Sequence, residues 1–406
     1  MTDADLKIPD EFKDQLSYVE GPDTRSDEEI LSTLTQYVPV SSEKNIWAFW
    51  HSGIVAMPAW CQRNVIDWVR INGPSWTIRV LDNVPDSPNY ILKHLPAETL
   101  PRSFIERTMD GPYVGQHSAD FLRGATVTLY GGVFMDVGNL LLRPIDMICW
   151  KELEDPNSPF NVAVPWMYGT TIAQHLIAAR KGDPFIQRWH DLFVHLWRNR
   201  QNHKGLIEDP LVAFSKEMKL DDARASNFHW DFKVPFQTVM EYITQVLVWT
   251  RVAMLEDVSA NGDGFSGVDY WTRHIKLIDC LPESWGAEAL LGFPGAGQKT
   301  LDLLALRRDF SLLETDPEQR AAHDLVWRLL TKSSLQKITH GKHLTHDLHL
   351  GALWDLPEHA GKDRAKGTYA ELLRYGSVHF AQTRRSVVTA EAPRPESTLR
   401  KALLEP

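Results

Sequence analysis

The hydrophobic and polar positions of residues 115–145 follow two different periods. Apolar residues recur at helical spacing from His117 to Tyr130, and Ser118 is the expected N-cap. Gly131 and Gly132 follow, and glycine readily adopts the left-handed conformation at which many helices end. The next three residues form an apolar run typical of a buried strand: Val133, Phe134 and Met135. This part of the chain therefore predicts a helix, a glycine turn and a short strand.

Three charged residues mark this predicted helix and strand. Asp120 and Arg123 lie one turn apart on the helix, and Asp136 directly follows the strand. The spacing of Asp120 and Arg123 also suits a simple ion pair on an exposed helix, worth roughly 0.2–0.5 kcal/mol. A carboxylate placed at the end of a buried strand beside that helix is more typical of a binding site. We therefore expect the three side chains to share one site.

The residues before this segment alternate between strand and helix patterns. Residues 46–50 and 76–81 are apolar strand candidates, and residues 57–71 between them have helical periodicity. A strand, a helix and a strand in this order predict parallel strands in an α/β fold, with a ligand crevice at their carboxyl ends. His51 and Ser52 follow the first strand directly and are therefore candidates for that crevice.

Downstream of residue 145 the patterns predict two further strands and several helices. The strands are expected at residues 162–164 and 275–278. The helices are expected at residues 172–179, 184–199, 237–254, 299–310, 317–331 and 368–375. From these patterns we expect a helical N-terminal arm at residues 1–43, an α/β domain at 44–297, and a helical C-terminal region at 298–406 packed on the core.

Composition narrows the class of protein. The 406 residues carry a formal charge of −10, so there is no overall basic character of the kind that nucleic-acid binding requires. Three widely spaced cysteines match neither a disulfide framework nor a metal cluster, and they favour a reducing cytoplasm: Cys61, Cys149 and Cys280. Gln245 and Arg251 interrupt the most hydrophobic stretch, so no membrane span is expected. The fifteen tryptophans suit either a core or an aromatic pocket, and the oligomeric state stays open.

The central segment resembles a known enzyme family. The run H-S-A-D-F-L-R, followed by L-Y-G-G-V-F-M-D and ending at Asp136, resembles the DXD-motif segment of the capsular polysaccharide synthesis-like glycosyltransferases. Two further stretches, I-W-A-F-W-H-S-G from Ile46 and H-L-I-A-A-R-K-G-D-P-F-I from His175, resemble elements of the same family, in the same order. The resemblance covers residues 45 to about 190 and extends to fungal members of the family. It implies a GT-A-like, Rossmann-type nucleotide-sugar domain.

The resemblance also implies roles for individual residues. Trp50 would stack against the nucleotide base, and Asp120 would bond ribose or sugar hydroxyls. Arg123 would lie against the sugar or the diphosphate. Asp136 would be the first aspartate of DXD, a ligand of Mn²⁺ or Mg²⁺. The remaining candidates for donor binding are His51, Ser52, Asn139 and His175.

The chain departs from the family pattern at the metal motif. Gly138 stands where the second aspartate of DXD is expected, and Asn139 follows it. Manganese and magnesium prefer hard oxygen ligands, and glycine has no side-chain oxygen. Downstream, His175 replaces an asparagine of the pattern and Asp183 replaces a histidine. Metal dependence is therefore where the chain differs most from the pattern of the family that it resembles.

A second group of residues invites a metal hypothesis. Five histidines gather near the C-terminus: His340, His343, His346, His349 and His359. They lack the H-E-x-x-H arrangement of a helical zinc site. They suit either an exposed helix or loop, or a segment that closes over the donor.

These observations favour one function over two others. We expect transfer of a sugar from a nucleotide sugar to a soluble, hydrophobic small molecule, and the resemblance implies a retaining mechanism. The same fold could instead act on an apolar or diphosphate substrate in natural-product tailoring or cyclisation. Against this, Asp221-Asp222 lacks the third aspartate of a diphosphate-binding motif. A non-catalytic binding protein is the third alternative.

Overall fold

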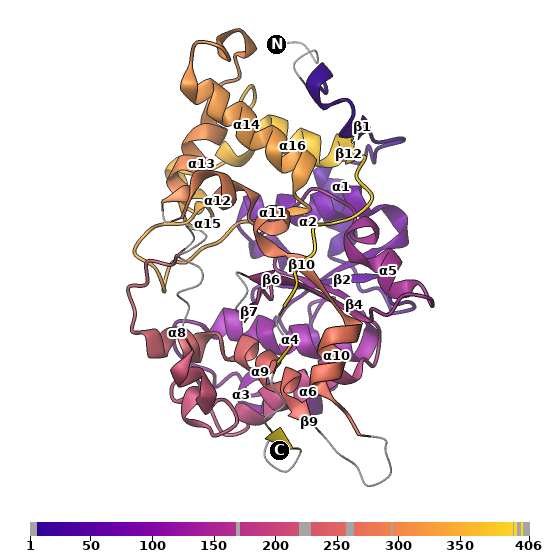
Figure 1. Ribbon diagram of the computed structural model, residues 1–406. Helices are drawn as coiled ribbons and strands as arrows, with labels where there is room; N and C mark the ends of the chain where they lie inside the picture. Colours follow the sequence, from indigo (N-terminus) through magenta and orange to yellow (C-terminus); the bar gives the residue numbers. More distant parts are fainter. Residues whose placement is uncertain are drawn as a thin grey trace.

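A seven-stranded mixed sheet forms the centre of the computed structural model, which describes residues 6–167, 171–218, 229–256, 264–293, 295–392, 394–395 and 399–400 (Figure 1). The strand order is β10-β6-β8-β4-β2-β3, and β7 pairs with β6. The strands are β2 (Asn45–Phe49), β3 (Thr77–Leu81), β4 (Gly132–Met135), β6 (Val162–Met167), β7 (Thr171–Ile172), β8 (Leu176–Ala179) and β10 (Ile275–Asp279). β2 is parallel to β3 and β4, whereas β8 is antiparallel to β4 and β6.

The parallel strands β2 and β4 bring two predicted segments to the same edge of the sheet. Trp47 lies opposite Phe134, so the next residues of the two strands leave the sheet side by side. Gly132 makes this close approach possible, because its φ is 95° and a Cβ there would collide with the carbonyl oxygen of Asn45. The chain after β2 therefore emerges next to Asp136.

Alternate residues of the strands face two separate helical layers, as the period of a strand requires. Trp47 and Phe49 pack in a core with helices α4 (Val114–Tyr130), α6 (Pro184–Leu196) and α9 (Thr244–Ala253), which lie below the sheet in Figure 1. Ile46 and Ala48 pack in the opposite core with α2 (Ala59–Asn72), α14 (Pro317–Lys332) and α16 (Tyr369–His379), which lie above it.

The C-terminal part is mainly helical and packs on the sheet domain (Figure 1). One of its strands, β11 (Leu335–Lys337), pairs antiparallel with β5 (Asn139–Leu141) in a separate two-stranded sheet. The N-terminal β1 (Leu16–Tyr18) pairs with β12 (Phe380–Gln382). The other helices and strands are α1 (Asp27–Leu34), α3 (Arg102–Ile105), α5 (Lys151–Glu154), α8 (Phe236–Tyr242), α10 (Gly267–His274), α11 (Cys280–Ser284), α12 (Gly286–Leu291), α13 (Ala296–Ala305), α15 (Leu350–Trp354), β9 (Leu255–Glu256) and β13 (Leu399–Arg400).

This arrangement confirms the α/β class and the helical C-terminal part, while the domain boundaries at 43/44 and 297/298 stay predictions. The helix expected at residues 172–179 is wrong, because this segment forms β7 and β8. The helix expected at 237–254 is divided into α8 and α9. Ser118 does not cap a helix, because α4 begins at Val114 and the Ser118 hydroxyl donates to the Val114 carbonyl.

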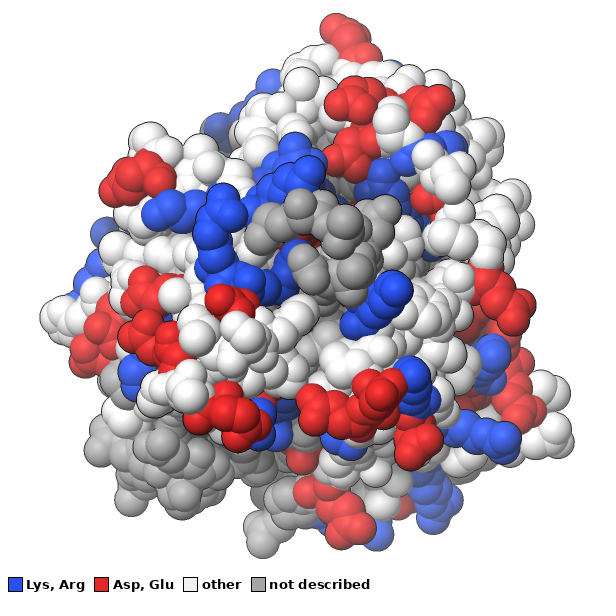
Figure 2. Space-filling model, turned by 90° about the horizontal axis from the view of Figure 1, so that it is seen from above, with Lys and Arg blue, Asp and Glu red and all other residues white. Residues whose placement is uncertain are grey.

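The sequence allowed the tryptophans to fill either a core or an aromatic pocket. Most of them are core residues. Seven of them are almost fully buried: Trp47, Trp68, Trp150, Trp189, Trp197, Trp249 and Trp327. Among the described ranges, none of the helices combines the length and apolar character that a bilayer span requires. On the face seen in Figure 2, Lys and Arg side chains gather near the centre, and acidic side chains lie around them.

Candidate functional site

The three charged residues predicted from sequence meet at the carboxyl end of β4. The Nη1 of Arg123 lies 2.5 Å from Oδ1 of Asp120, and its Nη2 donates to Oδ1 of Asp136 at 2.9 Å. The side chains of Arg123 and Asp120 are only 3% and 5% exposed. They are therefore not the exposed ion pair that the helical spacing alone allows. A guanidinium fork that joins two carboxylates fixes the end of β4 against α4.

A fourth charged residue, Lys337, completes the cluster, and no motif in the sequence indicates it. The Nζ of Lys337 donates to the other oxygen of Asp136, Oδ2, at 2.7 Å. Burial alone would raise the pKa of Asp136, but the positive charges of Lys337 and Arg123 outweigh it and hold the pKa well below its usual range. We call Asp120, Arg123, Asp136 and Lys337 the charge cluster.

Three further polar side chains surround Asp120 and Arg123. Gln174 Nε2 donates to Oδ1 of Asp120 at 3.0 Å, and His117 Nδ1 lies 3.2 Å from Oδ2. Gln245 Oε1 accepts from Arg123 Nη1 at 2.6 Å. In the sequence, Gln245 is notable only because it interrupts an apolar stretch, which is the signal a buried polar partner leaves.

The predicted residues Asn139 and His175 hold the turn that follows Asp136. The carbonyl of His175 accepts from the Asp136 amide at 3.0 Å and from Asn139 Nδ2 at 2.8 Å. Burial and the charge of Lys337 lower the pKa of His175 to about 3, so its ring is neutral at physiological pH. The described residues offer no partner to His175 Nε2, Asn139 Oδ1 or Gln174 Oε1. These three atoms flank the charge cluster, and this position makes them candidates for ligand contacts.

Trp50, His51 and Ser52 lie at the same edge of the sheet but outside the charge cluster. Trp50 is half-buried, and His51 and Ser52 are exposed in the turn after β2. The carbonyl of His51 accepts from the Asn83 amide at 3.1 Å, which ties this turn to the end of β3. In the part of the chain that the structure describes, no hydrogen bond joins this turn to Asp136.

The charge cluster does not fit a divalent metal ion. Both oxygens of Asp136 are held by cations, and Gly138 contributes no side chain. A Cβ at Gly138 would lie only 2.7 Å from the carbonyl oxygen of Ile338, so this position has no room for a second carboxylate. Within the described ranges, no group of three or more His, Cys, Asp or Glu side chains could hold a metal.

The histidines of the C-terminal segment contact several different elements, and within the described residues none of them bonds to Asp136. The carbonyl of His343 accepts from the Tyr113 hydroxyl at 3.3 Å. His340 Nε2 lies 3.0 Å from Asp355 Oδ2, and His349 stacks on Phe293. A role for this segment in closing over the donor stays a prediction. Asp221 and Asp222 lie outside the described residues.

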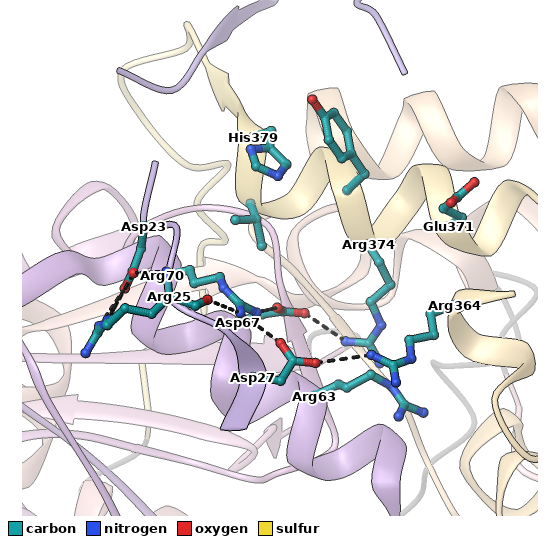
Figure 3. A pocket seen from close by; sticks show the side chains of 12 residues that line it. Asp23, Arg25, Asp27, Arg63, Asp67, Arg70, Arg364, Glu371, Arg374 and His379 are labelled. Atoms are coloured by element: carbon teal, nitrogen blue, oxygen red, sulfur yellow. Dashed lines mark hydrogen bonds and ion pairs between the residues drawn. The ribbon is translucent and has the colours of Figure 1, made fainter. Parts of the chain in front are cut away.

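A cavity of about 420 Å³ between α1, α2 and α16 is lined by a network of ion pairs (Figure 3). Arg374 donates to Asp67 and Asp363 and also to Asn64 Oδ1 at 2.6 Å. Asn64 in turn donates to the Val137 carbonyl at 2.9 Å. The network therefore supports the loop after Asp136 from behind, and its charges largely neutralise one another.

Similarity to known proteins agrees with this site. Residues 24–206 match the family described as capsular polysaccharide synthesis protein. The probable glycosyltransferase FCK3 of Fusarium pseudograminearum (strain CS3096) is 51% identical over 401 residues, which cover 98% of this chain and 99% of that protein. The O-glycosyltransferase braB of Annulohypoxylon truncatum is 37% identical, over 95% of this chain and 91% of its own length. The O-glycosyltransferase PaGT of Phomopsis amygdali is 36% identical, over 89% and 88%.

These relatives decide between the three functions that sequence left open. They are named as glycosyltransferases, not as cyclases or as binding proteins. The identity extends over nearly the whole chain, so it includes both the sheet domain and the helical C-terminal part. The chain therefore belongs to the capsular polysaccharide synthesis family, and it is a glycosyltransferase.

Proposed function

We propose that this enzyme transfers a sugar from a nucleotide sugar to a hydroxyl group of a soluble, hydrophobic small molecule. The observation that carries the proposal is the charge cluster at the carboxyl end of β4, where α/β folds bind their ligands. Two relatives are named as O-glycosyltransferases, which supports an oxygen atom as the acceptor. The three cysteines are free and buried, as suits a reducing cytoplasm, the compartment we propose.

Transfer requires one bond to form at the anomeric carbon of the sugar while another breaks. The acceptor hydroxyl oxygen forms the new bond to this carbon and loses its proton. The bond between the anomeric carbon and the diphosphate oxygen breaks, and its electron pair stays on the diphosphate. The diphosphate can take the acceptor's proton, as in a retaining transfer. Its growing negative charge is the main target for stabilisation by the protein.

The four residues of the charge cluster differ in exposure, and this difference suggests which of them contact a ligand and which position the others. Asp136 is 28% exposed and Lys337 is 16% exposed, so both can reach a ligand. Arg123 is buried and donates to three acceptors, and it therefore positions Asp120 and Asp136. Asp136 orients sugar hydroxyls. Behind it, Asp120 accepts hydrogen bonds from Arg123 and Gln174 and holds both side chains in place. Trp50, with His51 and Ser52 beside it, lies at the same sheet edge and offers a face for the base.

The test is product formation with purified enzyme. Nucleotide sugars of uridine and guanosine are incubated with a set of phenols and apolar alcohols, and the products are identified by mass spectrometry. Asp136→Asn is expected to lower transfer by about 100-fold or more at an unchanged fold, because the carboxylate meets the donor. The matched control is Asp302→Asn, an exposed aspartate on α13.

Two results would contradict this proposal. If no nucleotide sugar gives a glycoside with any acceptor hydroxyl, the assigned donor and acceptor classes are wrong. If Asp136→Asn transfers sugar as fast as the wild type, Asp136 lies outside the site and the charge cluster is structural.

A further inference from the structure

Lys337 lies where a second aspartate of a DXD motif would place its side chain. A Cβ built on Gly138 would be 3.6 Å from the Nζ of Lys337. The same Cβ would meet the carbonyl oxygen of Ile338, the residue after Lys337. The glycine and the lysine are therefore a matched pair, because any side chain at position 138 would meet the Ile338 carbonyl, and the Lys337 ammonium lies in the space beside it.

The backbone holds the ammonium in this place. β11 pairs with β5, with Lys337 opposite Asn139, and the Ile338 amide donates to the Gly138 carbonyl at 2.7 Å. Position 337 is thus fixed against the turn that carries Asp136, across about 200 residues of sequence. An ammonium positioned by a paired strand needs little reorganisation before it acts.

We propose that the ammonium of Lys337 takes the place of the divalent metal and binds the diphosphate of the sugar donor, so that transfer needs no metal ion. This inference rests on the proposed function. An ammonium group has three N–H donors, and in the described structure one of them is directed to Asp136 Oδ2. The other two are available to phosphate oxygens, whereas the Nη atoms of Arg123 are already committed to Asp120, Asp136 and Gln245.

The lysine performs the electrostatic part of the transfer. When the bond between the anomeric carbon and the diphosphate breaks, the electron pair moves to a diphosphate oxygen. The ammonium stabilises this charge through hydrogen bonds without giving up its proton. Asp136 keeps the ammonium aimed at the donor, as it would otherwise keep a metal ion.

The experiment measures binding of nucleoside diphosphates by calorimetry. UDP and GDP are titrated into the full chain in EDTA and again with Mn²⁺, and uridine, guanosine, UMP and GMP serve as comparators. The expected result is diphosphate binding of equal affinity with and without Mn²⁺. Lys337→Met should weaken diphosphate binding about tenfold or more and leave nucleoside binding unchanged. Lys337→Arg should keep most of the affinity, because it keeps the charge.

A matched control and a second readout make the test decisive. Lys332→Met removes an exposed lysine only five residues away and should bind both diphosphates as the wild type does. Electron paramagnetic resonance of Mn²⁺ should show no ion bound to the protein, with or without UDP and GDP. Thermal unfolding of each variant verifies that it is folded.

The possible failures can be told apart. If UDP or GDP binds only with Mn²⁺, or if Lys337→Met binds them as tightly as the wild type, the inference is wrong and the proposed function stands. If neither diphosphate binds under any condition, the proposed function fails, and the inference fails with it.

Discussion

The Nζ of Lys337 lies 2.7 Å from Oδ2 of Asp136, although the two residues are 201 positions apart in the chain. This ion pair joins the helical C-terminal part of the enzyme to the end of a central strand. It is partly exposed, whereas the pair of Arg123 and Asp120 behind it is buried. The two halves of the charge cluster should therefore respond differently to loss of a cation.

The first prediction compares these two cations. Arg123→Met should lower the free energy of unfolding by about 3–5 kcal/mol, because it leaves Asp120 buried without a positive partner. Lys337→Met should cost no more than about 1 kcal/mol, since solvent and Arg123 still reach Asp136. Urea unfolding of both variants measures the difference. Equal losses of unfolding free energy in the two variants would contradict the prediction, because burial would then have no effect on the cost of losing a cation.

The second prediction concerns acid. Burial lowers the pKa of five histidines from 6.5: that of His175 to about 3, and those of His94, His190, His203 and His349 to about 4. The unfolded chain protonates these rings near pH 6.5 and the native state does not. Stability is therefore present above pH 6.5 and is lost as the pH falls towards 4, by up to about 1.4 kcal/mol per pH unit for each ring.

Denaturant unfolding between pH 7 and pH 4.5 measures this loss. The midpoint should fall steeply over this range, with the activity following it. A midpoint that stays level would show that these rings are protonated in the native state.

The third prediction concerns a buried carboxyl group, for which stability is lost as the pH rises rather than as it falls. Burial raises the pKa of Glu288 from 4.5 to about 7, and Gln336 beside Lys337 donates to its Oε2 at 2.8 Å. A native carboxyl that binds its proton more tightly adds stability at low pH, and this contribution is lost as the pH rises through 7. Glu288→Gln should therefore exceed the wild type in stability at pH 8, by up to about 3 kcal/mol.

Urea midpoints at pH 8 and pH 5 provide the comparison. The gain of Glu288→Gln should be large at pH 8 and much smaller at pH 5. A gain of the same size at both values would assign it to packing rather than to the charge.

The fourth prediction concerns the ion-pair cavity in Figure 3. Arg374→Met should destabilise the protein by about 1–3 kcal/mol, since Asp67 and Asp363 each lose one of two cationic partners. Arg70 and Arg63 remain paired with these carboxylates. Asn64 also loses the bond that orients its amide towards the Val137 carbonyl. Transfer activity should fall as well, because this carbonyl belongs to the loop after Asp136.

A matched variant separates charge from geometry at this position. Arg374→Lys keeps the charge but lacks the fork that reaches Asn64 and both carboxylates, so it should recover only part of the stability. Full recovery by Arg374→Lys, measured by urea unfolding, would show that the hydrogen bonds to Asn64 and Asp363 contribute little.

Much of the site segment follows from local sequence. The apolar period of residues 117–130, the two glycines and the run before Asp136 predict α4, its end and β4, because each depends on residues within a few positions. The same reasoning is wrong for residues 172–179. A short apolar run fits a strand or a helix equally well there, and only pairing with β4 and β6 decides between them.

The sequence by itself determined the α/β class, the helix with Asp120 and Arg123, and the strand that ends at Asp136. It also showed that position 138 lacks a carboxylate, but not what stands in its place. Only the tertiary structure brought Lys337 to Asp136, because the pairing of β11 with β5 joins segments about 200 residues apart. No local period or motif encodes such a contact, since it depends on how the helical C-terminal part packs on the sheet.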